Sequence, residues 1–362
     1  MKQGMKKICF IAQFPPPMHG LSKAVETLYN SELQNKFEFE KVNITDNKMF
    51  LHNIWSIMKS KADLFYFTIS QTRGGNIRDL IIFRLLRMQH KKCLIHLHGG
   101  HYRQLVDKDL PSWQRKANYK AVSHLDGAIV LGDSLKPIFR GMIDDDKIFV
   151  IPNCVDDEYL MSDEEFDEKI SFFEERSVKH VLYLSNFIRS KGYPEVLELA
   201  RIEKERCEQG EQRKLHFDFA GKFFEESEKR FFFDYIKEYR LDDYVTYHGV
   251  VGGNKKRALL NKCDIFVLLT RYPNEGQPIS ILEAMGNAMM IVTTDHAGIP
   301  DIVKDGENGI VVHTYKINVD DVYAKIVASN ICEFAINNRQ NVNKMYVQKR
   351  YIENMEECFI YA

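Results

Sequence analysis

The chain has 362 residues, of which 44% are hydrophobic and 28% are charged, and this length suits two domains of about 150 to 200 residues better than one core. Its seven cysteines are scattered and none forms a C-x-x-C pair, which excludes a disulfide framework and a cysteine zinc site and fits the reducing cytoplasm. The first apolar stretch, residues 8–14, is too short for a signal or membrane-spanning segment, so we expect a buried strand there.

The net charge of −1 conceals an asymmetry along the chain. Residues 1–150 contain 23 Lys and Arg against 14 Asp and Glu, whereas the remainder contains 27 against 37. A basic first half is compatible with peripheral contact with the inner face of a membrane, and residues 82–92 mix apolar and basic side chains as a surface-binding helix does. A solvated helix is the alternative. Nucleic acid is not expected as a partner, because no basic and aromatic binding module is present.

Short apolar runs rich in Val, Ile, Phe and Tyr recur through the first part of the chain, with longer helix-like stretches between them. These runs lie at residues 7–14, 64–69, 93–98, 127–131 and 148–152. Alternation of this kind predicts a parallel sheet covered by helices. The acidic stretch 156–176 then interrupts the pattern, and we place a domain boundary there.

A second series of apolar runs follows the boundary. These runs lie at residues 180–184, 215–220, 244–248, 265–269, 290–294 and 310–313, with helical segments such as 195–207 and 228–239 between them. Residues 342–361 have apolar side chains at helical intervals, which predicts a closing helix. The fold expected is α/β, with two Rossmann-like, doubly wound parallel-sheet domains facing a cleft. They span 1–160 and 177–340, and the C-terminal helix, 341–362, packs back toward the N-terminal domain.

The most informative motif is the stretch 275–285, Glu-Gly-Gln-Pro-Ile-Ser-Ile-Leu-Glu-Ala-Met, which follows the predicted strand 265–269. Pro278 suits a first helical turn, whose free N–H groups bind phosphate well. Glu275 and Glu283 flank this helix start, and carboxylates accept hydrogen bonds from vicinal hydroxyls such as those of a sugar or a ribose. A solvent-exposed helix face is the alternative for two glutamates at this spacing.

Three other strand ends carry unusual residues, and ligands of doubly wound sheets bind at such ends. After the strand 180–184, Arg189 and Lys191 are suited to neutralising a diphosphate at the start of a helix, or are simply solvated. Gly20, in the first strand-to-helix connection, allows close approach of backbone to a ligand. The segment 95–101 contains three histidines, but no linked carboxylate or cysteine completes a metal site, so a single histidine facing the cleft is the simpler interpretation.

Together, these segments resemble glycosyltransferase family 4, the retaining glycosyltransferases with the GT-B fold (glycosyl transferases group 1), over nearly the whole chain. The E-x7-E signature of that family is matched by Glu275 and Glu283, and its Lys-Gly pair by Lys191-Gly192. Its strand-ending histidine is matched by His98.

Further matches lie in the connecting segments. The glycine loop of the family is matched by Gly20, and its Asn-Gly-Val-Asp segment by 153–156, where Cys154 replaces the glycine. One departure matters, because Ser185-Asn186 stands where the family has Gly-Arg. Arg189 is our candidate replacement for that arginine.

The resemblance implies a hexosyltransferase-type enzyme (EC 2.4) that moves a sugar from a nucleoside-diphosphate sugar, with a UDP-sugar expected, to a glycan or lipid-linked acceptor. It implies catalytic roles for His98, Lys191 and Glu275, with Glu283 on the ribose. It places donor-binding residues at Gly20, Asn186, Arg189, Lys191, Gly221, Val250, Glu275, Gly276, Gln277, Pro278, Ile279 and Glu283.

No metal ligands and no cofactor are implied, because fixed cations and helix dipoles can stabilise the charge that forms on the leaving diphosphate. Surface-polysaccharide or glycoconjugate assembly in the cytoplasm, or at the inner membrane face, is the expected setting. A non-catalytic subunit that binds glycan and stabilises an active transferase is the alternative, favoured only by the missing arginine. An epimerase or phosphorylase on the same double fold is a third interpretation.

Overall fold

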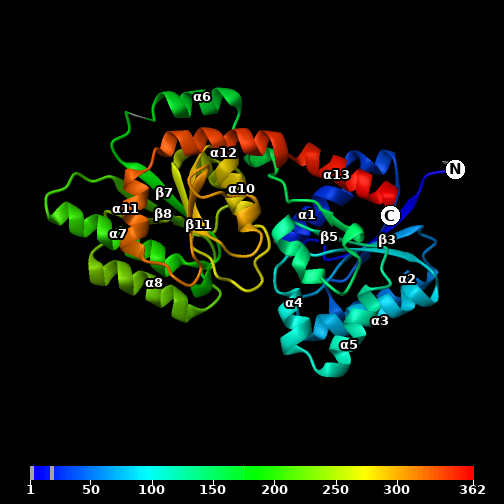
Figure 1. Cartoon of the computed structure of the whole chain (residues 1–362). Helices are drawn as coiled ribbons and strands as arrows, with labels where there is room; N and C mark the ends of the chain where they lie inside the picture. Colours follow the sequence, from blue (N-terminus) through cyan, green and yellow to red (C-terminus); the bar gives the residue numbers. More distant parts are fainter. Residues whose placement is uncertain (1–3, 17–19, 174) are drawn as a thin grey trace. The chain divides into compact units, whose positions relative to one another are not determined.

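The computed structural model describes residues 4–16, 20–173 and 175–362 (Figure 1). Residues 17–19 of the predicted glycine loop therefore lie outside the described part. The chain forms two compact units. Unit 1 comprises Met1–Asn153, Pro273–Gln277 and Lys349–Ala362, and unit 2 comprises Cys154–Tyr272 and Pro278–Gln348. A short segment of the E-x7-E motif thus belongs to unit 1, although the chain on both sides of it belongs to unit 2.

Unit 1 contains a six-stranded parallel sheet in the order β2-β1-β3-β4-β5-β6. The strands are β1 Lys7–Ala12, β2 Glu38–Asn43, β3 Leu64–Thr68, β4 Lys92–His96, β5 Gly127–Val130 and β6 Ile148–Val150. Five of these were expected from their apolar runs. Strand β2 was not, because it is an edge strand in which Val42 is the one buried residue, so its sequence has no apolar run.

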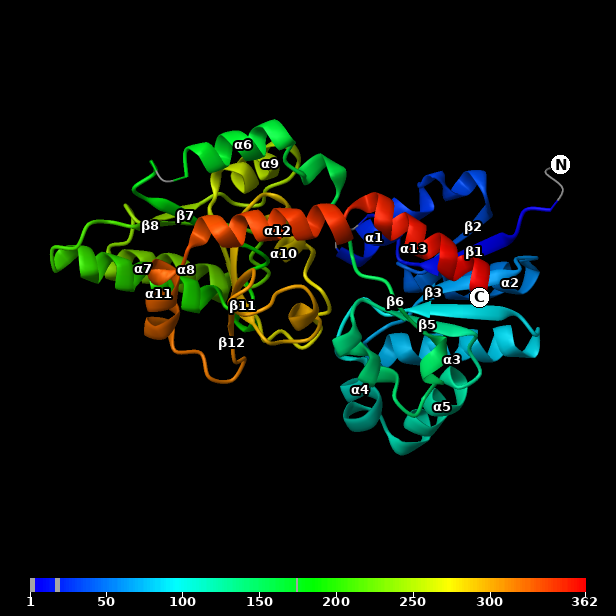
Figure 2. The same cartoon turned by 45° about the horizontal axis from the view of Figure 1, so that its top comes forward.

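Helices cover both faces of the unit 1 sheet, with α1 and α13 on one face and α3 and α5 on the other (Figure 2). Their bounds are α1 Gly20–Tyr29, α2 Phe50–Lys59, α3 Arg73–Met88, α4 Tyr102–Gln104, α5 Ser112–Val122 and α13 Gln348–Tyr361. The predicted surface helix 82–92 is wrong at its end. Helix α3 stops at Met88, His90 has a positive φ of 53°, and Lys92 already begins β4.

The C-terminal segment forms two helices where one was predicted over 342–361. Helix α12, Ile331–Met345, belongs to unit 2, and α13 belongs to unit 1. The break falls where the carbonyl of Tyr346 accepts a hydrogen bond from the Val155 N–H (2.8 Å), which withdraws that carbonyl from the helix. Helix α13 packs on its own unit, because the Phe359 ring lies against Phe10 of β1 and the Phe359 carbonyl accepts from the Lys6 ammonium (2.8 Å).

Unit 2 contains a second six-stranded parallel sheet, in the order β12-β11-β10-β7-β8-β9. The strands are β7 Lys179–Leu184, β8 Leu215–Ala220, β9 Val245–Tyr247, β10 Ile265–Leu268, β11 Met290–Thr294 and β12 Gly309–Val312. All six coincide with predicted runs to within one residue at each end. The four central strands do so because parallel strands buried on both faces read as continuous apolar sequence. The predicted α/β fold of two parallel-sheet domains is confirmed.

The acidic stretch taken as the domain boundary is largely a helix of unit 2. Its helix α6 begins with a capping box, in which the Ser162 hydroxyl accepts from the Glu165 N–H and the Glu165 carboxylate accepts from the Ser162 N–H. The units divide between Asn153 and Cys154, so they differ from the predicted ranges 1–160 and 177–340. The α-helices of unit 2 are α6 Asp163–Ser171, α7 Tyr193–Glu208, α8 Glu226–Tyr239, α9 Gly253–Lys262, α10 Ile279–Gly286, α11 Val319–Ala328 and α12 Ile331–Met345.

Short helical turns complete the description: η1 Glu32–Asn35, η2 Asn47–Met49, η3 Leu105–Asp109, η4 Asp133–Phe139, η5 Asp145–Lys147, η6 Asp157–Tyr159, η7 Arg189–Lys191 and η8 Ile299–Asp301. Across the described ranges, no helix combines the length and the apolar character that a membrane span requires.

Candidate functional site

Glu283 is the most informative residue of unit 2. It lies on α10, which begins directly after the Pro278 N-cap, and its exposed fraction is only 4%. Its Oε1 atom accepts a hydrogen bond from the Lys256 ammonium (2.6 Å). Burial raises the pKa of Glu283, while the Lys256 charge opposes that rise. The alternative of a solvent-exposed helix face is therefore excluded for this glutamate.

Lys256 itself was missed by the sequence analysis. It lies on α9, where its ammonium is 4.1 Å from the ring centroid of Tyr159 as well as next to Glu283. In the sequence it is the middle one of three consecutive basic residues, 255–257, and nothing local distinguishes it from its neighbours. Only the packing of α9 shows which of the three meets the buried carboxylate.

The loop after β7 carries Lys191 and is fixed by the glycine that follows it. Gly192 has a φ of +84°, a conformation that L side chains rarely adopt, and a Cβ there would lie 2.5 Å from the Leu269 carbonyl oxygen. The loops after β7 and β10 therefore pack in close contact at this glycine. Lys191 lies over the ring of Tyr272, with its ammonium 4.9 Å from the ring centroid. This arrangement places Lys191 directly before the N-terminus of α7, a helix of sixteen residues.

Arg189 is already paired with a carboxylate of α8. Its Nε donates to Glu228 Oε1 of α8 (2.9 Å), and its guanidinium lies 4.3 Å from the Phe231 ring centroid. A diphosphate would have to compete with Glu228 for it. Asn186, at the position of the family arginine, accepts a hydrogen bond from the Tyr183 hydroxyl through its carbonyl (2.9 Å).

Arg271, an arginine that sequence reasoning missed, contacts the residue that precedes Lys191. Its N–H donates to the Ser190 carbonyl (2.6 Å), and its guanidinium pairs with Glu195 in the first turn of α7 (2.5 Å). Its position after strand β10 is a signal that could have identified it, because ligands of such sheets bind beyond the strand ends.

The remaining predicted donor contacts of unit 2 also lie beyond strand ends. Gly221 follows β8, and its N–H donates to the carbonyl of Gly249 in the loop after β9 (2.9 Å). Val250, next to Gly249, has an exposed fraction of 71%. The loops after β7, β8, β9 and β10 thus share the carboxyl edge of the unit 2 sheet, which is where a doubly wound domain binds ligands.

The segment Pro273–Gln277 is attached to unit 1 by hydrogen bonds at the ends of β5 and β6. Gln277 accepts from the Asn153 N–H through Oε1 (2.7 Å) and donates to the Leu131 carbonyl through Nε2 (3.0 Å). The Asn153 side chain donates to the Gln277 carbonyl (2.9 Å). Asn153 and Gln277, which both lie in segments that match the family motifs, therefore form hydrogen bonds with each other. Glu275, in the same segment as Gln277, has an exposed fraction of only 7%.

Gly276 lies against the end of β4, in the same unit. A Cβ at Gly276 would collide with the His98 carbonyl oxygen, so only glycine permits this approach. The ring of His98 lies tilted by 33° against that of His96, with their centroids 3.9 Å apart. His96 is fully buried, its Nδ1 lies 2.7 Å from the Tyr66 hydroxyl, and burial lowers its pKa well below the usual range.

The three histidines of the 95–101 segment have different partners. His96 is next to the Tyr66 hydroxyl, whereas the Nε2 atom of His101 lies 3.1 Å from the Asp109 carboxylate. Within the described ranges they do not converge as metal ligands. Gly20 begins α1, separately from these residues along the chain.

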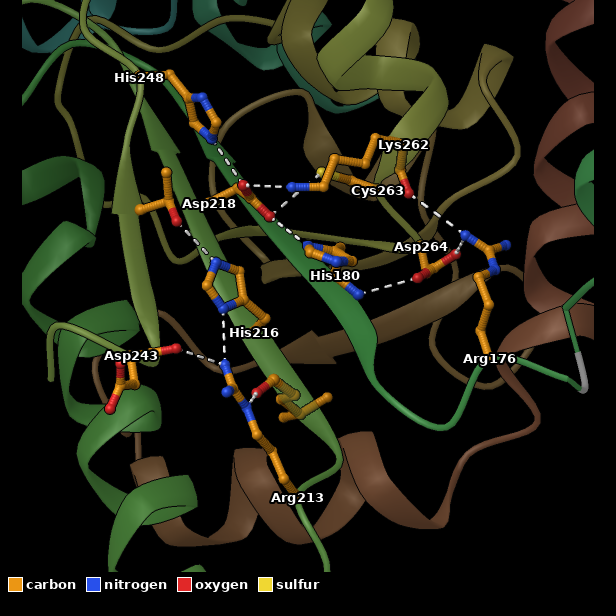
Figure 3. A network of polar contacts seen from close by, with 12 residues as sticks. Arg176, His180, Arg213, His216, Asp218, Asp243, His248, Lys262, Cys263 and Asp264 are labelled. Atoms are coloured by element: carbon orange, nitrogen blue, oxygen red, sulfur yellow. Dashed lines mark hydrogen bonds and ion pairs between the residues drawn. The ribbon is translucent and has the colours of Figure 1, made fainter.

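One histidine cluster in unit 2 has ligand-like spacing. Among the described residues, His180, His216 and Asp218 are the group whose candidate ligand atoms all lie within 4.8 Å of one another (Figure 3). The buried Asp218 carboxylate accepts from His180 (2.6 Å) and His248 (2.6 Å), as well as from the Lys262 ammonium (3.1 Å).

The third ligand candidate of that cluster is already bonded on both sides. Arg213 donates to His216 Nδ1 (2.7 Å), so the proton of the neutral ring lies on Nε2, which is 2.8 Å from the Thr246 hydroxyl. A metal ion bound at Nε2 would require the proton to lie on Nδ1 instead. The ring could then no longer accept the hydrogen bond from Arg213. The charged groups of the cluster are therefore paired with one another. The hydrogen bonds from His180, His248 and Lys262 hold the pKa of Asp218 well below its usual range despite burial.

Comparison with known structures identifies the fold. The chain has the fold of GT-B glycosyltransferases. Anabaena Alr3699/HepE, solved in complex with UDP, matches it with a TM-score of 0.74 and 14% identity over 99% of this chain and all of the other. Sucrose-phosphate synthase from Thermosynechococcus elongatus matches with a TM-score of 0.73 and 14% identity over 98% of each chain. At this identity, the likeness shows the fold alone.

Part of unit 2 is similar in sequence to a known family. Residues 163–333, slightly less than half of the chain, match the family described as glycosyl transferases group 1. The putative colanic acid biosynthesis glycosyltransferase WcaL of Salmonella typhimurium (strain LT2) is 30% identical over 104 residues, which are 28% of this chain. The match spans about a quarter of that relative (24%).

Proposed function

We propose that the protein is a retaining glycosyltransferase of family 4 that moves a hexose from a nucleoside-diphosphate sugar, with UDP as the nucleotide, to a glycan or lipid-linked acceptor. The observation that carries this proposal is the burial of Glu283 on a helix that begins at the Pro278 N-cap after strand β10. A buried carboxylate is costly unless it is paired and hydrogen-bonded; the Lys256 ammonium meets one of its two oxygens, and vicinal ribose hydroxyls would supply two further donors.

The cationic part of unit 2 suits the leaving diphosphate. Cleavage of the bond between the anomeric carbon and the phosphate oxygen leaves negative charge on that oxygen. In our proposal, the Lys191 ammonium and the first N–H groups of α7 stabilise this charge without a metal ion. The loops with Asn186, Gly221 and Val250 would hold the rest of the nucleotide.

The proposed sugar contacts are assigned by the family resemblance. Glu275 and the backbone of residues 276–279 would hold the sugar hydroxyls, and His98 would contact the sugar near its reacting carbon. The packing of Gly276 against the His98 carbonyl within unit 1 supports a common role for the two segments, because it fixes one relative to the other.

The proposed setting is the assembly of a surface polysaccharide, on the cytoplasmic side and with unit 1 in peripheral contact with the inner face of a membrane. The similarity of part of the chain to a putative colanic acid glycosyltransferase supports this setting. The excess of basic residues in the first 150 residues supports the membrane contact.

The proposal is tested by incubating the protein with UDP-, GDP- and dTDP-sugars in the presence of EDTA. Release of nucleoside diphosphate and the shift in melting temperature are followed for each donor. A UDP-sugar should raise the melting temperature, and EDTA should change neither result. If no nucleotide sugar binds, the assignment fails; loss of activity with EDTA overturns metal independence alone.

A non-catalytic subunit that binds glycan is the second candidate, and the pairing of Arg189 with Glu228 favours it. That pairing leaves the missing family arginine without an evident replacement at residue 189. Binding of UDP without turnover on any acceptor, together with stabilisation of an active transferase, would support this candidate over the first.

A further inference from the structure

Helices α2 and α3 of unit 1 carry a concentration of exposed apolar side chains. Sixteen large hydrophobic residues in the described ranges are strongly exposed, and six of these lie on the two helices. The six are Leu51, Trp55 and Met58 on α2, and Ile77, Ile81 and Met88 on α3. Leu51 and Met88 have exposed fractions of 80% and 70%. We call the solvent-facing side of these two helices the α2–α3 face.

The spacing of these residues produces a continuous stripe on each helix. Leu51, Trp55 and Met58 follow the i, i+4, i+7 spacing that places side chains on one face of a helix. The buried residues of α2, Asn53 and Ile57, fall between them on the inner side. Helix α2 therefore buries one face, which contains Asn53 and Ile57, and exposes this apolar stripe on another face.

Helix α3 has a matching stripe next to that of α2. Ile77, Ile81 and Met88 lie at i, i+4 and i+11, and Arg84 occupies the i+7 position between them. The two helices are neighbours, because the Gln89 side chain, at the end of α3, donates to the Met58 carbonyl (3.2 Å). Apolar residues and a cation thus share one face.

The charges of this region are strongly one-sided. Residues 46–92 contain nine Lys and Arg but only three Asp. Asp79 is buried and paired with Arg78 (2.9 Å), and Asp63 accepts from the Lys7 N–H (2.8 Å). The third, Asp46, accepts from a main-chain N–H of η2 as its N-cap.

Four cations, three on the α2–α3 face and one in the turn η2 directly before α2, have no acidic partner. Lys48, Lys59, Arg84 and Arg87 are exposed, and none of them forms an ion pair with a described residue. Lys59 instead lies over the ring of Trp55, with its ammonium 3.9 Å from the ring centroid. Their charge is therefore available to an external anion.

We infer that the α2–α3 face docks on an anionic phospholipid bilayer, with the two apolar stripes inserted at the headgroup level and the four cations on lipid phosphates. Helices that lie in a membrane interface have this composition, and a tryptophan next to a lysine suits the boundary between headgroups and acyl chains. A second copy of the chain fits less well, because two such faces would repel each other.

This inference rests on the membrane contact in the proposed function and names the surface that makes it. It differs from the sequence-based expectation, which placed the contact on residues 82–92. Those residues include Ile82, Phe83 and Leu86, which are buried in unit 1. The apolar anchors are instead the exposed residues of α2 together with Ile77, Ile81 and Met88 of α3.

The chain has only two tryptophans, Trp55 and Trp113, and this permits a direct test on the full-length protein. A Trp113→Phe variant leaves Trp55 as the single fluorophore. We expect its emission to shift to shorter wavelength, and to be quenched by brominated lipid, with vesicles of phosphatidylcholine and phosphatidylglycerol but not of phosphatidylcholine alone. The matched control is Trp55→Phe/Trp113→Phe/Phe224→Trp, because Phe224 of unit 2 is similarly exposed, at 62% against 53% for Trp55.

Co-sedimentation with the same vesicles separates the two kinds of contact. Arg84→Gln/Arg87→Gln should weaken binding about 25-fold, since each cation near an anionic surface contributes about fivefold. Leu51→Ser/Trp55→Ser should weaken it at least tenfold through lost apolar burial. Lys229→Gln/Lys237→Gln, which removes two basic residues of α8 in unit 2, should leave it within twofold.

The inference is overturned if Trp55 emission does not respond to anionic vesicles, or if the unit 2 control responds equally. It is also overturned if the Leu51 and Trp55 substitutions change the sedimentation mass of the protein but not its vesicle binding, since the occupant would then be a second copy. A UDP thermal shift on every variant keeps the two proposals distinct. Vesicle binding without a UDP shift would refute the proposed transferase function and support the membrane-docking face. A UDP shift without vesicle binding would support the transferase function and refute the membrane-docking face.

Discussion

Replacing Glu283 with glutamine isolates the charge of the proposed ribose contact from its shape. The side chain is almost fully buried, so glutamine must occupy the same space, with its amide 2.6 Å from the Lys256 ammonium on one side. Hydrogen bonds to a charged acceptor contribute about 1.5–3 kcal/mol, against about 1 kcal/mol for neutral ones. For two ribose hydroxyls we expect UDP to bind about 2 kcal/mol more weakly, which is roughly a 30-fold increase in Kd.

The pH dependence of UDP binding provides a second readout of the same residue. Burial raises the pKa of Glu283, so the folded protein protonates it at a higher pH than the ordinary glutamate pKa of about 4.3. Protonation removes the charged acceptor. The affinity of the parent protein for UDP should therefore fall as the pH decreases toward that raised pKa, and Glu283→Gln should lack this part of the pH dependence.

Isothermal titration with UDP measures both effects, and Glu165→Gln is the matched control. Glu165 forms a two-bond ion pair with Arg257, the residue after Lys256 on α9 (2.9 and 2.7 Å). Its substitution removes a carboxylate from the same helix surface without touching Glu283. If Glu283→Gln binds UDP as tightly as the parent protein does, or if Glu165→Gln loses as much affinity, the ribose contact is refuted.

Three further predictions address other parts of the site and fold. In the donor assay, Lys191→Ala should lower kcat about 100-fold with a smaller change in KM. Arg189→Ala removes a guanidinium that is already paired with Glu228, so it should change turnover less than about threefold. Gly276→Ala should lower the free energy of unfolding by about 1–3 kcal/mol in a denaturant titration and reduce turnover, because its Cβ would displace the Glu275 segment from the His98 carbonyl; parental stability would refute that packing. Asp218→Asn should lower the melting temperature at neutral pH. The difference should begin to narrow below about 3.9, the usual Asp pKa, and should vanish only as the pH falls through the depressed pKa of the folded carboxylate; a pH-independent difference would refute this account.

The strands of both sheets could be predicted wherever both of their faces are buried. Strand β2 could not, because an edge strand with alternating charged residues has no apolar run to detect. The break between α12 and α13 was also hidden, because it depends on a hydrogen bond from Val155, almost two hundred residues earlier in the chain. Local sequence patterns predict what is buried, but not what a distant segment does to the backbone.

The candidate site follows the same division. Glu275 and Glu283 were recognisable because their motif is contiguous in sequence and follows a buried strand, and Lys191 because it lies in the connection after another buried strand. Their partners were not. Lys256 reaches Glu283 through the packing of α9, and Gln277 bonds to Asn153, 124 residues away in the chain. A side chain whose role depends on a tertiary contact carries no signal in its own neighbourhood.

The two arginines near Lys191 show how this limit affects the mechanism. Sequence spacing favoured Arg189 as the replacement for the missing family arginine, but its guanidinium donates to Glu228 and stacks on Phe231, both on α8. Arg271 is also paired, with Glu195, yet that pair lies in the first turn of α7, the helix start that Lys191 precedes. A diphosphate bound there would lie near Arg271 without breaking any contact of Arg189. In the proposed donor site, the cationic side would therefore consist of Lys191, the α7 N–H groups and Arg271, which comes from the loop after β10 and not from the loop after β7.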